Sequence, residues 1–250
     1  VDYGGGKEAV RELKNRLDLI YEGRPKNLGV DKDFATVVKK FQIPKEYPEA
    51  LIDGFLDAGV DVIDIGLCGT EEVYFSTPYF EASAGLMVTA SHNPINYNGI
   101  KFVGKGSRPL EVDSEFDRIR QEAEIGGKTS SNGNKGFYLA KRIEARDAYV
   151  DKILNVVGPD LLPPLKVVVN CGNGAAGPAL RGFKEELLKR KAALQIIEMF
   201  NEPDSTFPHG IPNPSLSENH HWTAERVKSS GADFGVAFDG DFECHTGQFF

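Results

Sequence analysis

The sequence lacks the long apolar segments by which a chain crosses or enters a membrane. No run approaches the ~18 consecutive apolar residues of a membrane span. Charged residues recur from Asp2 to Lys14, which leaves no room for the apolar core of a signal peptide. We therefore expect a cytoplasmic protein with no membrane association.

Cysteine is also scarce. The chain has three, Cys68, Cys171 and Cys244, which are far apart and form no CxxC pair. An odd number with this spacing predicts neither a disulfide framework nor a zinc site. We expect Cys68 and Cys171 to be small buried hydrophobic residues in a reducing compartment.

The chain has no excess of basic charge. Its 29 basic and 37 acidic side chains give a formal net charge of −8. This balance argues against general nucleic-acid binding, although a local pocket can still hold an anionic ligand. Apolar residues make up 40%, and the 27 glycines and 14 prolines show no period, which excludes a disordered or collagen-like chain.

Short β-branched segments alternate with amphipathic ones along the chain. This alternation predicts βαβ units, and hence an α/β fold with mixed or parallel sheets. The expected helices cover residues 7–22, 47–59, 111–124, 143–157, 178–191 and about 222–230. The expected strands cover residues 60–66, 84–90, 99–104, 165–170, 193–200 and 232–241.

The length of 250 residues suits one large or two ordinary domains. Two adjacent prolines, Pro163 and Pro164, offer the best boundary. We therefore expect two consecutive layered α/β domains, at residues 1–160 and 161–250.

The segment Thr-Ala-Ser-His-Asn-Pro at residues 89–94 follows an expected strand directly. Ligands of open α/β sheets usually bind at such strand ends. A serine hydroxyl needs a base or a charged partner to react, and His92 and Lys101 are the local candidates to activate Ser91. The alternative is a turn in which Ser91 and Asn93 only cap backbone groups.

Three carboxylates, Asp239, Asp241 and Glu243, follow the last expected strand at alternate positions. Their oxygens can converge on one hard cation such as Mg²⁺, which also offsets the cost of three close anions. The alternative is a polar turn that closes the strand. A calcium EF-hand does not fit the sequence, because the twelve-residue loop and its flanking helices are missing.

The glycine-rich turn at residues 172–177 matches GxGxxG, but the match to a dinucleotide site is poor. The acidic residue that would read the ribose should end the next strand, and only Glu198 or Glu202 stands near that place. The rigid proline-rich loop at residues 208–214 suggests a connector between domains or a wall.

Two further groups of metal-ligating residue types lack zinc-like spacing, namely His220-His221 and Cys244-His245. We expect these histidines to lie in solvated loops.

Five stretches occur together and in a fixed order: TASHNP, NYNGIK, NCGNGAAGP, FPHGIPNPS and AFDGDF. In this combination, over about residues 47–243, the sequence resembles the α-D-phosphohexomutases, in particular the bacterial phosphomannomutase/phosphoglucomutase branch. The resemblance implies an isomerase that interconverts mannose or glucose 1-phosphate and 6-phosphate through a phosphoserine and a hexose 1,6-bisphosphate.

The resemblance also implies roles for individual residues. Ser91 would carry the phosphoryl group, and a phosphate oxygen there would share Mg²⁺ with Asp239, Asp241 and Glu243. Lys101 would supply a point charge or transfer a proton, and His92 would orient the substrate.

The sequence departs from the family pattern at several positions. Glu243 replaces the third aspartate, and Cys244 stands where an arginine belongs. Residues 2–6 and 29–33 also lack the arginines of the family's motifs. The sugar-recognition loop and phosphate clamp of the family's third and fourth domains are not found, so we expect little turnover from this chain alone.

These departures keep two alternatives open. One is a non-catalytic relative that binds a sugar phosphate or a protein partner, which the missing arginines favour. The other is a phosphatase-like hydrolase that uses the same serine and metal.

Overall fold

A computed structural model describes residues 33–37, 46–93, 97–125, 135–158 and 162–249. Contacts divide the chain into two compact units. The first comprises residues 1–66, 73–89 and 97–142, and the second comprises residues 67–72, 90–96 and 143–250. Each unit is an α/β domain with parallel and antiparallel strands, so the expected fold class is confirmed.

The first unit contains a five-stranded sheet with the order β4-β3-β1-β2-β5. Only the β3–β4 pair is antiparallel among its ladders. The strands are β1 (Asp33–Val37), β2 (Asp61–Asp64), β3 (Ala84–Thr89), β4 (Gly99–Gly104) and β5 (Tyr138–Ala140).

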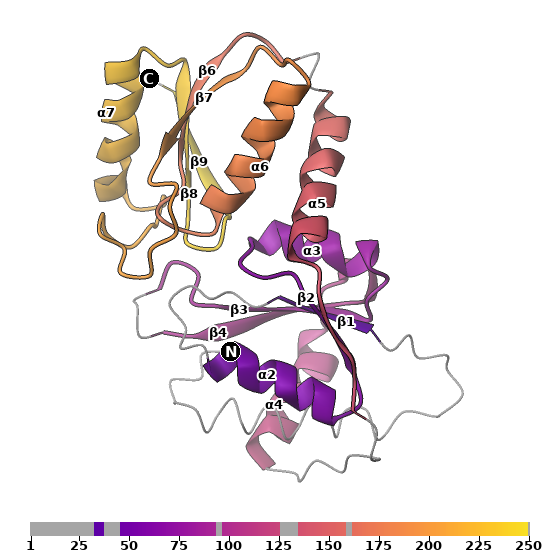
Figure 1. Ribbon diagram of the computed structural model, residues 1–250. Helices are drawn as coiled ribbons and strands as arrows, with labels where there is room; N and C mark the ends of the chain where they lie inside the picture. The colour runs from indigo at the N-terminus through magenta and orange to yellow at the C-terminus, as the bar shows by residue number, and fades with distance from the viewer. Residues whose placement is uncertain (1–32, 38–45, 94–96, 126–134, 159–161, 250) are drawn as a thin grey trace. The chain divides into compact units, whose positions relative to one another are not determined.

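Helices cover both faces of this sheet (Figure 1). Leu51 and Phe55 of α2 (Glu46–Asp57) pack against Leu86 and Val88 on one face, where Ile119 of α4 (Asp117–Ile125) joins them. A π-helical turn (Val112–Phe116) precedes α4, and a 3₁₀ turn (Lys105–Ser107) follows β4. On the other face, α3 (Thr70–Tyr79) approaches β3.

The second unit contains a four-stranded sheet with the order β7-β6-β8-β9. Its strands β6 (Lys166–Asn170), β7 (Gln195–Met199) and β8 (Phe234–Phe238) are parallel, and β9 (Cys244–Phe249) pairs antiparallel with β8. Parallel strands point their carboxyl ends to one edge, so the loops after β6 and β8 lie together there.

Helices α6 (Ala176–Lys189) and α7 (His220–Ser230) cover opposite faces of this sheet (Figure 1). A 3₁₀ turn (Ser217–Asn219) leads into α7. The odd-numbered residues of β6, Val167 and Val169, face α6 with its Leu180, and the intervening Val168 lies on the α7 side with Val227. Helix α5 (Arg142–Val157) packs on α6 through the rings of Tyr149 and Phe183, 5.9 Å apart.

Most expected elements are present, some with shifted ends. The strand expected at residues 99–104 is β4 with the same bounds, and α6 begins two residues earlier than expected. Four elements were not expected, namely β1, α3, β5 and β9. The helix expected at residues 7–22 lies outside the described residues.

The grouping of α5 differs from the division expected at residue 160. That division assigned the helix to the first domain, whereas its contacts, from Ile143 onward, group it with the second unit. The presence or absence of further domains stays a prediction.

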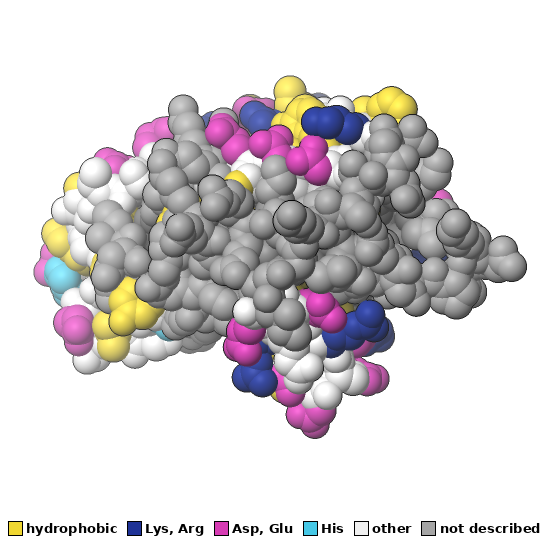
Figure 2. Space-filling model, turned by 90° about the horizontal axis from the view of Figure 1, so that it is seen from below, with side chains coloured by type: hydrophobic (Ala, Val, Ile, Leu, Met, Phe, Trp, Pro, Cys, Tyr) yellow, Lys and Arg dark blue, Asp and Glu magenta, His cyan; other side chains and the backbone are white. Residues whose placement is uncertain are grey.

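Surface charge is mixed on the face shown in Figure 2, where acidic and basic side chains of the described residues lie next to one another. Arg120 and Asp117 on α4 form an ion pair, 3.1 Å apart. None of the helices in the described part of the chain combines the length and apolar composition that crossing a bilayer requires.

Candidate active site at the acidic loop

A tight turn after β8 brings three carboxylates together. Asp239 Oδ1 accepts the backbone N–H groups of Asp241 at 3.2 Å and Glu243 at 2.8 Å. These bonds fold the loop back, so ligand oxygens of the three residues lie within 4.8 Å of one another. Asp239 and Asp241 are fully buried, and Glu243 is half-buried.

The electrostatics of this loop are unfavourable for the chain alone. Burial, and then the neighbouring Asp241 charge, raise the pKa of Asp239 to about 7. Two buried carboxylates side by side are costly unless a cation or a proton offsets their charge. The negative charge of the folded loop is thus not balanced by the loop's own side chains.

The loop after β3 places Ser91 beside these carboxylates. The Ser91 hydroxyl lies 3.2 Å from Asp239 Oδ2 and 3.3 Å from Asp241 Oδ1, and donates to them. Its backbone has φ of 52°, in the left-handed region, and Asn93 closes the turn by donating from its side chain to Ala90 O. Residues 90–96 belong to the second unit, so this contact lies within one unit.

His92 lies at the open side of the same cluster. Its Nδ1 is 3.2 Å from Ser91 Oγ and 3.7 Å from Asp239 Oδ2. The His92 side chain is 46% exposed, while that of Asp239 is inaccessible. The ring can therefore meet an incoming ligand while it contacts the serine hydroxyl.

The donor set fits a hard divalent cation. Carboxylate and hydroxyl oxygens are the ligands that Mg²⁺ prefers, at about 2.0–2.1 Å, which requires ligand oxygens roughly 3–4 Å apart. The three carboxylates already lie within 4.8 Å of one another, with Ser91 Oγ next to two of them. Asp239, Asp241, Glu243 and Ser91 could thus hold one ion after small adjustments.

Lys101 is the one predicted site residue in the first unit. It lies in the middle of β4, opposite Met87 of β3 in the antiparallel ladder. Its role next to Ser91 therefore stays a prediction.

The glycine-rich turn of residues 172–177 supports the acidic loop. A Cβ at Gly174 would lie 2.8 Å from Gly240 O, and the Ala175 N–H donates to the same oxygen at 3.0 Å. Glycine allows this close approach of two backbones. In the structure the turn contacts protein backbone at the place where a dinucleotide fingerprint would bind phosphate.

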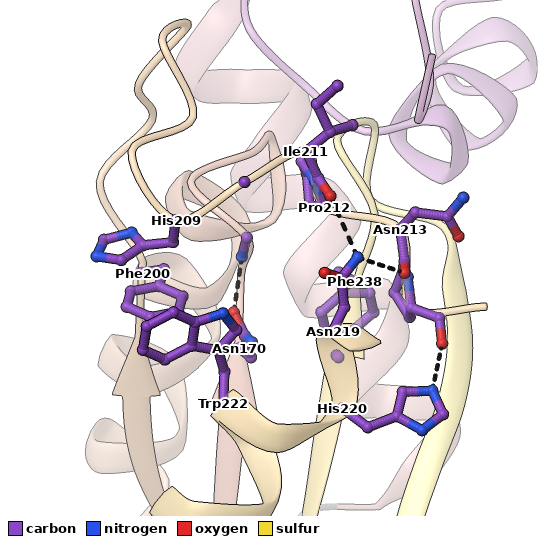
Figure 3. A pocket seen from close by; sticks show the side chains of 14 residues that line it. Asn170, Phe200, His209, Ile211, Pro212, Asn213, Asn219, His220, Trp222 and Phe238 are labelled. Atoms are coloured by element: carbon purple, nitrogen blue, oxygen red, sulfur yellow. Dashed lines mark hydrogen bonds between the residues drawn. The ribbon is translucent and has the colours of Figure 1, made fainter. Parts of the chain in front are cut away.

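Two interpretations of the proline-rich loop of residues 208–214 were open, a connector between domains or a wall. The wall is confirmed, and the connector is wrong because the loop lies within the second unit. It forms one wall of a pocket near α7 (Figure 3). The His209 ring stacks on Phe200 with centroids 3.7 Å apart, and Trp222 meets both rings edge-on. Asn219 fastens the loop by donating to two of its carbonyls.

The expectation that His220 and His221 lie in a solvated loop is wrong, because both lie in a helix. They begin α7, where His220 Nε2 lies 2.8 Å from Pro214 O and His221 Nδ1 lies 2.7 Å from Glu218 O. Both contacts organise the start of the helix. The side chains of Cys244 and His245 lie outside the described residues.

Cys68 and Cys171 are buried, as expected. Burial, and to a lesser extent the charge of Glu198, raise the pKa of the Cys171 thiol to about 12. In the folded protein at pH 8, iodoacetamide is expected to modify both thiols at least about 100-fold more slowly than in urea, because both are buried and because the raised pKa of Cys171 lowers its share of the reactive thiolate. Mass spectrometry of the two peptides measures this, and rapid modification of native Cys171 would contradict it.

Comparison with known proteins identifies the family. Residues 44–127 match "Phosphoglucomutase/phosphomannomutase, alpha/beta/alpha domain I", and residues 147–246 match domain II of the same family. The chain belongs to this family. Both halves of the candidate site, the Ser91 loop and the acidic loop, lie in the matched ranges.

Individual family members agree with this assignment. The chain is 47% identical over 241 residues to a phosphomannomutase of Salmonella montevideo, covering 95% of the chain and 51% of that protein. It is 46% identical over 206 residues to a protein named "Phosphohexose mutases" of Xanthomonas campestris pv. campestris, covering 80% of the chain and 44% of that protein.

A solved structure shows the same architecture. A phosphoglucomutase/phosphomannomutase family protein from Burkholderia thailandensis superposes with a TM-score of 0.76 at 26% identity, over 95% of this chain and 49% of that one. The chain thus spans about half the length of the relatives it matches.

Proposed function

We propose that this protein is a hexose-phosphate mutase that interconverts the 1-phosphate and 6-phosphate of mannose or glucose through a phosphoserine at Ser91. The observation that carries the proposal is the position of the Ser91 hydroxyl, 3.2 and 3.3 Å from the buried carboxylates of Asp239 and Asp241. A hydroxyl in that position can hold a phosphoryl group next to a bound cation.

Two phosphoryl transfers account for the reaction. In the first, the bond between phosphorus and Ser91 Oγ breaks, a sugar hydroxyl forms the new bond to phosphorus, and its proton passes to a base. The product is a hexose 1,6-bisphosphate. After the sugar turns over, the bond between its other oxygen and phosphorus breaks, Ser91 Oγ loses its proton and forms the new bond to phosphorus, and the sugar oxygen takes up a proton. This leaves the isomerised monophosphate and a phosphorylated serine.

The acidic loop explains why this serine suits the chemistry. Phosphorylation replaces the hydroxyl donor of Ser91 with about −1.5 to −2 charges next to Asp239 and Asp241. We propose that these carboxylates, Glu243 and the Ser91 phosphate hold Mg²⁺. When bound, Mg²⁺ supplies positive charge that stabilises the transferring phosphoryl group.

The remaining site residues act on the substrate side. His92, which contacts Ser91 Oγ and is half-exposed, orients the sugar phosphate. Lys101 donates a hydrogen bond or transfers a proton at the reacting oxygen. We place the enzyme in the cytoplasm, with hexose phosphates as its substrates.

Phosphoryl uptake tests the proposal on this chain. The protein is incubated with glucose 1,6-bisphosphate and Mg²⁺, and intact-mass measurement is followed by peptide mapping. We expect one phosphoryl group per chain, on the peptide that contains Ser91. The result that would overturn the proposal is an unmodified Ser91 peptide at saturating bisphosphate, in this chain and in a protein extended to the full length of its relatives.

The same incubation separates the alternatives. A non-catalytic relative would bind the bisphosphate without taking up phosphate, and Cys244 at the family's arginine position favours that candidate. A hydrolase would release inorganic phosphate steadily and form no isomerised sugar.

A further inference from the structure

An ion pair between a buried glutamate and a partly buried arginine lies in the second unit. Arg146 of α5 donates from Nε to Glu72 Oε1 at 3.0 Å, and their side chains are 21% and 3% exposed. Burial raises the pKa of Glu72, although the Arg146 charge opposes the shift. A buried ion pair is often no more stabilising than an apolar pair of the same size, so its presence here calls for a role.

The ion pair holds the 67–72 segment in place at three points. Arg146 Nη2 donates to Leu67 O, and Glu72 Oε2 accepts the Gly69 N–H at 2.7 Å. The second bond joins a glutamate to the residue three positions before it, at the start of α3, as in a capping box. With the Arg146–Glu72 contact itself, these bonds leave the segment little freedom.

The 67–72 segment in turn lies directly against the acidic loop. The Thr70 N–H donates to Asp241 O at 3.0 Å. A Cβ at Gly69 would lie 2.4 Å from Cδ1 of Phe242, so the Phe242 ring packs directly against the backbone of Gly69. The first contact falls on Asp241, which the proposed function assigns to Mg²⁺, and the second falls on Phe242, which lies between Asp241 and Glu243.

Helix α5 connects this arrangement to α6. Besides the Tyr149–Phe183 contact with α6, Val150 packs at Gly182 of α6. Arg146 lies one turn before Tyr149 on the same helix. The contacts therefore run without a break from α6, through α5 and Arg146, to the backbone of Asp241.

We infer that Arg146 and Glu72 are positioning residues, which set the geometry of the acidic loop through the 67–72 segment and so determine its affinity for a divalent cation. This inference rests on the proposed function for the identity of the ligands. Neither side chain is a ligand itself. Neither residue stands out in the sequence, where the only signal is a glutamate three positions after Gly69.

Mn²⁺ binding, followed by electron paramagnetic resonance, measures the effect on the whole chain. Loss of groups that orient metal ligands typically weakens metal binding about 10–100-fold, and we expect an increase of that size in the Kd of R146M. R146K keeps the charge but not the planar fork that reaches both Glu72 and Leu67 O, so its Kd should rise less.

R190M is the matched control. The Arg190 side chain is also 21% exposed and joins α5 to α6 through Asp151, away from the 67–72 segment. We expect R190M to lower Tm and to leave the Kd for Mn²⁺ within about twofold of the wild-type value. Equal losses of Mn²⁺ affinity in R190M and R146M would show that the effect follows from lower stability, and would overturn the inference. Wild-type Mn²⁺ affinity in folded R146K and R146M would overturn it as well.

Hydrogen exchange separates failure of this inference from failure of the proposed function. The Thr70 amide, bonded to Asp241 O, should exchange faster in R146K than in R190M, with or without a metal. If the wild-type chain binds no Mn²⁺, the metal site of the proposed function fails, and Thr70 exchange alone decides whether Arg146 positions the loop. Unchanged Thr70 exchange in R146K would overturn the inference.

Discussion

Replacing Asp239 with asparagine is expected to abolish divalent-cation binding while it makes the cation-free protein more stable. The asparagine Oδ1 can still accept the N–H groups of Asp241 and Glu243, so the loop keeps its shape. The substitution removes a buried negative charge next to Asp241. The negative charge that destabilises the cation-free protein is therefore the same charge that binds the cation.

The sizes of both effects follow from the position of Asp239. We expect the Kd for Mn²⁺ to rise at least about 100-fold, beyond the effect of removing an outer-shell partner. Burial and Asp241 raise the pKa of Asp239 to about 7. At roughly 1.4 kcal/mol per pKa unit, a rise from 3.8 to about 7 corresponds to about 4 kcal/mol at pH 8, so the cation-free variant should gain up to that amount.

Urea unfolding at pH 8, with EDTA or with Mg²⁺, measures both effects in one experiment. The wild-type protein should be stabilised by Mg²⁺, and D239N should show the higher stability in EDTA with no response to Mg²⁺. E225Q, which removes an exposed carboxylate from α7, serves as the control and should behave as the wild type. A D239N protein that is less stable in EDTA and still responds to Mg²⁺ would refute this account of the loop.

Removing the hydroxyl of Ser91 is expected to eliminate phosphoryl uptake from glucose 1,6-bisphosphate. Both S91A and S91G lack the oxygen that accepts the phosphoryl group, so labelling should fall at least about 10³-fold. The three carboxylates remain, and Mn²⁺ binding should stay within about tenfold of the wild-type value. Labelling and metal binding should therefore separate in these variants.

The two variants should differ in stability because of the backbone at position 91. Its φ of 52° lies in the left-handed region, which costs an alanine about 1 kcal/mol more than a glycine. We expect S91G to unfold at the higher urea concentration of the two. Phosphoryl uptake by S91A at another residue would contradict the assignment of Ser91, and equal stability would contradict the role of the backbone.

Local patterns were sufficient for many elements of the fold. Residues 99–104 form β4 with the expected bounds, because the apolar Ile100 and Phe102 alternate with other residues there. The expected strand at residues 84–90 is β3, because a short continuous apolar run is typical of a strand buried on both faces. Helix α3 was missed because its buried side includes Thr70, Ser76 and Thr77, and Pro78 lies within it. A buried polar side has no apolar period to detect.

The short edge strand β5 shows a second limit. All three of its residues are exposed, and only the partners in β2 define it as a strand. Such a strand depends on pairing with residues far away in the chain, about which the local sequence carries no information. The same holds for β9, which pairs with β8.

Residue types alone identified Ser91 and the three carboxylates as candidates, since each group follows a strand in a pattern suited to its chemistry. Ser91 and Asp239 are 148 positions apart in the sequence, and only the tertiary structure brings them together. The tertiary structure also decides the burial that raises the pKa of Asp239 and the contacts through which Arg146 and Glu72 support the loop. Side-chain chemistry is a property of single residues, whereas desolvation and distance depend on which backbones pack together.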